Sequence, residues 1–189
     1  MYFAIASAII AVACSAITIK TLVGYSDIRR SRKIIVGLLV VVGWFAPLLV
    51  GLVRDSGLFG PEAFAVVSKI LYLMFGTVFI LFSMLLFRDV VWFALYWIYS
   101  KIFGENWKLH PKNINLLDKA NFIVVLLTAV LASMAVYGGA REPELKRLEF
   151  ASARISKDMR IVMINDTHIN RTTPVETVRK LVDRVNALD

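Results

Sequence analysis

Four long apolar stretches dominate the first 140 residues of the chain. They cover about residues 1–23, 34–53, 63–87 and 120–140. Lys20 and Lys69 are their only charged residues, and both lie where a side chain can extend to an interface. Each stretch can cross about 30 Å of hydrocarbon as a helix, which satisfies its own backbone hydrogen bonds. The pattern therefore predicts an α-helical membrane bundle of four transmembrane helices over residues 1–140.

A shorter apolar segment, VVWFALYWIYSKIF at about residues 90–103, follows the third stretch. It is short for a crossing and rich in Trp and Tyr, which favour the headgroup level of a bilayer. We predict an interfacial helix here. The alternative is an extension of the third span past Arg88 and Asp89.

Residues 141–189 are more charged and form a second region. We expect the start of a soluble α/β domain, with strands at about 147–155 and 160–165 and a helix at about 174–188. The continuous apolar run Ile161–Ile164 is typical of a strand covered on both faces in a parallel sheet. The helix is amphipathic, with valines along one face, and needs a surface to pack on.

A strand, a loop and one helix cannot bury a strand that is apolar on both faces. Further strands and helices are needed to cover it. We therefore expect that the chain ends inside a domain, which is incomplete at Asp189.

Composition and charge support a membrane protein. The chain is 58% hydrophobic with a mean hydropathy of +0.69 and a net charge of +8. Its basic residues gather beside the apolar stretches, which favours a role in topology and contact with anionic lipid over nucleic-acid binding. The single cysteine, Cys14, leaves the redox compartment open.

The strongest basic cluster, DIRRSRK at residues 27–33, follows the first span and is expected to stay in the cytoplasm. The loop after the second span carries one Arg against Asp55 and Glu62, so it is expected outside. Four spans then place both ends outside. We predict a multi-pass protein of the plasma (inner) membrane with an extracytoplasmic tail.

Asp166 and His168 are the candidate metal ligands of the tail. They follow the apolar run Ile161–Ile164, at the strand end where open α/β sheets place ligands. A carboxylate and an imidazole two residues apart suit Zn, Mn or Fe. The alternative is an ordinary turn in which Asp166 bonds nearby backbone amides. His110, in a loop before a proline, is interpreted as an interfacial residue.

The order of these features resembles the membrane-anchored branch of the calcineurin-like metallophosphoesterases. Four spans lead into YGGAREPELKRLEF, then MRIVMINDTHI and a helix ending VDRVNALD. In that family a strand ends in Ser-Asp-x-His, and its Asp and His bind one ion of a two-metal centre. Here Asn165 replaces the Ser, and Thr167 replaces an apolar residue.

The resemblance implies a hydrolase of phosphate esters that uses two divalent ions of Mn, Fe or Zn. The location beside the bilayer would suit a lipid-linked phosphate as substrate. The resemblance assigns metal binding to Asp166 and His168 alone. The family's Gly-Asp, Gly-Asn-His and Gly-His-x-His motifs would lie beyond Asp189. We therefore expect these 189 residues to be inactive by themselves, and no catalytic residue is assigned.

Two other functions stay open. The chain is then either a non-enzymatic four-span protein whose tail binds a partner subunit, or a small transporter or channel built from the bundle. The partner would be a completing chain that pairs with the exposed strand edge. A transporter would carry ionisable residues within its spans, where only Lys20 and Lys69 are found, so it ranks last.

Overall fold

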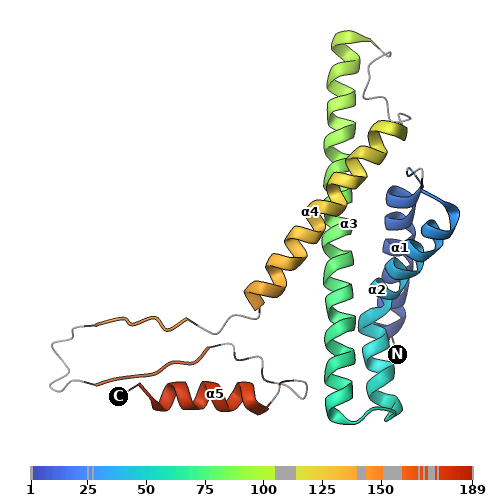
Figure 1. Ribbon diagram of the computed structural model, residues 1–189. Coiled ribbons are helices and arrows are strands. Elements are labelled where there is room, and N and C mark those ends of the chain that lie inside the picture. Colours follow the sequence, from blue (N-terminus) through green and yellow to red (C-terminus); the bar gives the residue numbers. More distant parts are fainter. Residues whose placement is uncertain are drawn as a thin grey trace.

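The computed structural model describes residues 2–24, 26, 28–104, 114–139, 144–150, 159–165, 167, 169, 173 and 175–188. Within these residues the chain forms five α-helices and no strand. The helices are α1 (Tyr2–Val23), α2 (Arg30–Ser56), α3 (Pro61–Phe103), α4 (Ile114–Gly139) and α5 (Val175–Asn186). Figure 1 shows α1 to α4 in one bundle, with α5 apart from it.

The four-span prediction is confirmed: α1 to α4 are each long and apolar enough to cross a membrane. The first span keeps its predicted bounds within a residue. The second is longer, from Arg30 to Ser56, because charged residues at a helix end can enter the headgroup layer without breaking the helix. The chain is therefore a multi-pass membrane protein by the length and composition of its helices.

The separate interfacial helix predicted at 90–103 is wrong, because these residues form the second part of α3. This helix runs unbroken for 43 residues, or about 64 Å. From Thr77 to Phe103 it contains no Gly and no Pro, the residues that most often bend helices. As the alternative expected, the helix of the third span continues past Arg88 and Asp89.

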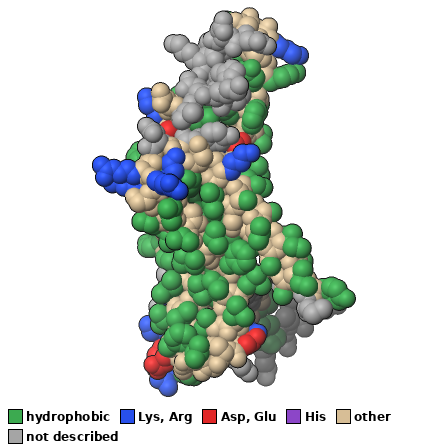
Figure 2. All heavy atoms as spheres, turned by 90° about the vertical axis from the view of Figure 1, so that its right-hand side faces the viewer, with side chains coloured by type: hydrophobic (Ala, Val, Ile, Leu, Met, Phe, Trp, Pro, Cys, Tyr) green, Lys and Arg blue, Asp and Glu red, His purple; other side chains and the backbone are tan. Residues whose placement is uncertain are grey.

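Neighbouring helices of the bundle alternate in direction, with α1 on α2, α2 on α3, and α3 on α4 (Figure 1). The N-terminal end of α1 and the C-terminal end of α4 point the same way. Figure 2 shows an uncharged, largely apolar band between two levels at which charged side chains gather. Exposed Arg29, Arg30 and Arg32 lie at the α1–α2 turn, and Arg54 and Asp55 lie at the opposite end of α2. This distribution fits a bilayer around the band.

Trp44 of α2 is the centre of the bundle core and is 6% exposed. Its ring meets Phe75, Phe79 and Phe82 of α3 edge-on, with centroids 5.4–6.3 Å away. Its indole N–H donates to the Thr18 hydroxyl of α1 at 3.3 Å, and that hydroxyl donates to the Cys14 carbonyl at 2.7 Å. The buried polar atoms of Trp44 and Thr18 are therefore satisfied while three helices are joined.

Gly43 lets α2 and α3 approach closely. A Cβ atom at this position would lie 2.5 Å from Cγ2 of Val78 and 3.3 Å from the Met74 carbonyl oxygen. Small residues of this kind are typical where membrane helices pack backbone to backbone. The neighbouring Ala46 is completely buried in the same helix.

The tail differs from the prediction in its strands. Neither 147–150 nor 160–165 forms a strand; the remainder of the first predicted strand, 151–155, lies outside the described residues. A strand exists only where a neighbour completes its hydrogen-bond ladder, and no such neighbour is found in the part of the tail that the structure describes. The predicted helix is confirmed as α5, from Val175 to Asn186.

Candidate functional site

The two predicted metal ligands, Asp166 and His168, lie outside the described residues. Asn165 and Thr167 beside them are described, and both are exposed. Over the range that the structure describes, no three His, Cys, Asp or Glu side chains come together as a metal site. The metal site therefore stays a prediction from the sequence.

The apolar run before this motif is uncovered. Ile161 and Met163 are 78% and 79% exposed, and Val162 and Ile164 are 42% and 48% exposed. The apolar stripe of α5 is only partly covered, because Val178, Leu181 and Val185 are half-buried and no residue of the helix is buried. Both elements have the pattern of parts that pack in a domain core, and both are available to a covering partner.

A second polar site, which the sequence reasoning missed, lies where α1, α3 and α4 meet. Arg88 of α3 is 8% exposed, and its Nε donates to Oδ1 of Asp89 at 2.9 Å. A second guanidinium nitrogen donates to Oδ1 of Asn121, on α4. Asn121 is 3% exposed. We call Arg88, Asp89 and Asn121 the polar clamp.

The polar clamp also holds the end of α1. The side-chain amide of Asn121 donates to the carbonyl of Thr21 at 3.3 Å and to that of Leu22 at 3.1 Å. Carbonyls in the last turn of a helix have no partner within the helix, and the negative end of the helix dipole lies there. Asn121 supplies the missing hydrogen bonds, and the nearby Arg88 supplies the favourable charge.

The chemistry of the clamp is structural. The Arg88 guanidinium offers only hydrogen-bond donors, and the Asp89 carboxylate is engaged as its counter-ion. The signal in the sequence was an Arg-Asp pair within the apolar region between 63 and 103. In the local sequence such a charged pair indicates the end of a span. Its partner, Asn121, is 33 residues further along the chain, so the local sequence does not indicate that Arg88 is buried.

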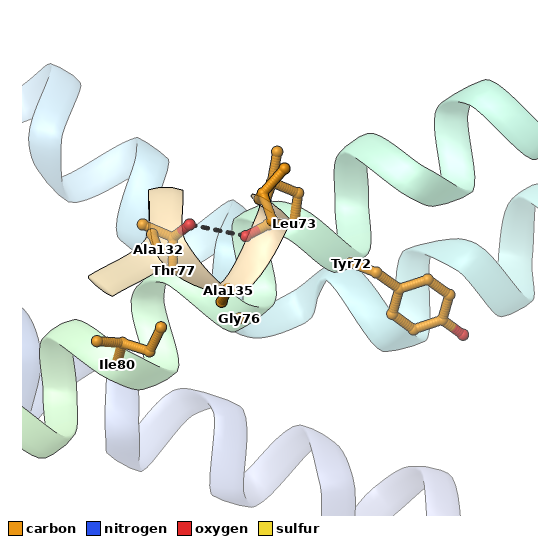
Figure 3. Close-up of a pocket in the computed structure, with 8 residues that line it drawn as sticks. Tyr72, Leu73, Gly76, Thr77, Ile80, Ala132 and Ala135 are labelled. Carbon is orange, nitrogen blue, oxygen red and sulfur yellow. Dashed lines mark hydrogen bonds between the residues drawn. The ribbon is translucent and has the colours of Figure 1, made fainter. Parts of the chain in front are cut away.

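A shallow apolar cleft of about 220 Å³ lies between α3 and α4 (Figure 3). Small residues widen it: Gly76 on α3, and Ala132 and Ala135 on α4. Two of its lining residues carry a hydroxyl, Tyr72 and Thr77, and that of Thr77 donates to the Leu73 carbonyl at 2.8 Å. No charged side chain lines it and most of its lining is apolar, so the cleft is a place for apolar material.

Comparisons with protein-family models, with curated proteins and with solved structures found no match to this chain.

Proposed function

We propose that the chain is the membrane-embedded part of a metal-dependent phosphoesterase, in which Asp166 and His168 bind a divalent metal ion. The observation that carries this proposal is the order of elements along the chain. Four membrane-spanning helices are followed by an apolar run, then at once by Asn-Asp-Thr-His, and then by the amphipathic helix α5.

The side chains of Asp166 and His168 are of the type that binds a first-row metal ion, but two ligands are too few for a complete site. A carboxylate and a neutral imidazole suit Mn, Fe or Zn, whereas a catalytic zinc usually has three protein ligands. The remaining ligands must come from other residues, on this polypeptide or on a partner. When complete, a two-metal centre supplies an activated hydroxide and neutralises charge on the phosphate.

The membrane anchor favours a substrate held at the bilayer, such as a lipid-linked phosphate ester. We propose the plasma (inner) membrane as the location and the extracytoplasmic side for the tail. Support comes from the basic residues at the α1–α2 turn, which are retained on the cytoplasmic side in most membrane proteins. The N-terminus and the end of α4 lie at the opposite end of the bundle (Figure 1).

Metal binding tests the assignment of the two ligands. The full chain in detergent is expected to bind Mn²⁺, and Asp166→Ala or His168→Ala should each weaken binding by roughly tenfold or more. His110→Ala is the matched control, because His110 is the only other histidine, and it should bind like the parent. Isothermal titration with Mn²⁺ measures all four proteins.

Hydrolysis of a chromogenic phosphodiester is measured on the same samples, and none is expected above background. Mn²⁺-dependent cleavage lost in Asp166→Ala would show that the inactivity prediction is wrong. Equal Mn²⁺ affinity in all four proteins would refute the metal assignment and with it the phosphoesterase proposal.

The second candidate is a non-enzymatic four-span protein whose tail binds a partner subunit. The exposed run Ile161–Ile164 favours it, because an unpaired apolar segment can add a strand to another chain. The metal titration distinguishes the two candidate functions, because only the phosphoesterase needs Asp166 and His168 for metal uptake.

A topology reporter tests the side of the tail. Alkaline phosphatase, which is active only outside the cytoplasm, is expected to be active when fused after Glu149. The same enzyme fused after Arg29, in the basic turn, should be silent. Immunoblotting confirms that both fusions are made stably; a stable but silent fusion at Glu149 would reverse the proposed topology.

A further inference from the structure

The second part of α3 extends beyond the end of α1 and past the first turns of α4 (Figure 1). From Pro61 to Arg88 the helix is about 40 Å long, the thickness of a bilayer with its headgroups. At Arg88 it is level with the end of α1, through Asn121. The remaining residues, 89–103, add about 22 Å past that level (Figure 1). This part of α3 we call the α3 extension.

The α3 extension is largely apolar, and its one cation, Lys101, lies 4.1 Å over the ring of Trp97. Val90, Phe93, Trp97, Ile102 and Phe103 are between 58% and 65% exposed. A helix this apolar is normally buried, either in a protein core or in a membrane. Bending down onto the bilayer would break helix hydrogen bonds, and no Gly or Pro is present to allow it. The exposed apolar surface therefore calls for a protein partner that runs alongside.

A regular stripe of exposed, mostly apolar side chains on α3 indicates that the partner is another helix. Intervals of four and three residues alternate along the stripe, which is the period of helices that wind around each other. We call this stripe the α3 seam, and it consists of Phe79, Ser83, Leu86, Val90, Phe93 and Trp97. Its five large side chains are 52–61% exposed, whereas Val78, Leu85 and Arg88 on the other faces are buried against the bundle.

We propose that the α3 seam packs against the α3 seam of a second copy of this chain. Two copies inserted with the same topology present parallel seams, as a two-fold axis along the membrane normal requires. Ser83 is the small position, and its hydroxyl already bonds the Phe79 carbonyl at 2.9 Å, so it can be covered without loss.

The available area is sufficient for such a pair. Aromatic side chains bury about 150–250 Å² each, so the exposed part of the seam offers roughly 500 Å² per copy. A symmetric pair then covers about 1,000 Å², the lower limit of specific interfaces. The proposal does not depend on the phosphoesterase function, because it uses no residue of the tail.

Single-cysteine cross-linking tests the interface in native membranes. The background is Cys14→Ala, which removes the lone cysteine. Leu86→Cys and Val90→Cys, on the seam, are expected to form disulfide-linked dimers on mild oxidation, several-fold more than Ile102→Cys. Ile102 is the matched control: it is 65% exposed but lies on another face of the same helix. The cysteine-containing parent should also show twice the chain mass of 21.2 kDa in detergent-corrected light scattering.

Equal cross-linking at Val90 and Ile102 would overturn the proposal, because it indicates random collision. A monomeric mass together with no cross-linking at either seam position would also overturn it. Circular dichroism of each cysteine variant shows whether the helices are intact, so that a misfolded variant is replaced by Phe93→Cys on the same seam.

Discussion

Arg88→Leu is expected to destabilise the bundle by about 3 kcal/mol, near the lower end of the cost of breaking a buried ion pair. The substitution leaves Oδ1 of Asn121 without its donor and the Asp89 carboxylate without its counter-ion. The Asp89 side chain is 27% exposed, so water recovers part of the loss. Unfolding by SDS, followed by far-ultraviolet circular dichroism, measures the change in unfolding free energy.

Two controls identify the cause. Arg54→Leu removes an exposed arginine paired with Asp55 and should leave the unfolding curve unchanged. The double variant Arg88→Leu with Asp89→Leu should recover part of the loss, since replacing both partners removes the unpaired charge. A double variant as unstable as the single one would show that the ion pair is not what stabilises this junction.

Gly43→Leu is expected to cost about 1–3 kcal/mol or more, because it forces a side chain into a packed interface. Its Cβ atom alone would lie 2.5 Å from Val78, and the Met74 backbone closes the other direction. Separation of α2 from α3 would also remove the contacts of Trp44 with the phenylalanines of α3. Thermal unfolding in detergent, followed by tryptophan fluorescence, measures the loss.

Gly51→Leu is the matched control for this prediction. It adds the same side chain to the same helix, but nothing lies within 4 Å of its Cβ position. It should unfold at the parent temperature. If the two variants unfold alike, the close approach of α2 and α3 at Gly43 is not what limits the residue at this position.

The membrane helices could be predicted because long uncharged runs have few alternatives in lipid. The length of α3 was missed for a physical reason: a charged Arg-Asp pair signals the end of a span unless its partners are known. Those partners, Asn121 and the last carbonyls of α1, come from distant parts of the chain. The tight packing of Gly43 could not be predicted for a similar reason. It depends on how α2 and α3 are aligned, and the local sequence pattern does not reveal this alignment.

In the tail, the sequence predicted the helix correctly but not the strands. The helix α5 could be predicted from its own stripe, since helix hydrogen bonds are local. The strands could not, because their ladders depend on partners elsewhere, and the run Ile161–Ile164 is exposed. Asp166 and His168 lie outside the described residues, so the candidate metal site stays a prediction of spacing and residue type.

The unbroken course of α3 restricts how this segment can change. Each residue turns an α-helix by about 100°. The polar clamp faces α4, the α3 seam from Ser83 onward faces away from the bundle, and a single continuous helix fixes the angle between them. Deleting Asp89 would turn everything from Val90 onward by about 100° and misalign the two faces. Substitutions can accumulate along the α3 extension, but insertions and deletions must come in steps near seven residues to restore the helical phase.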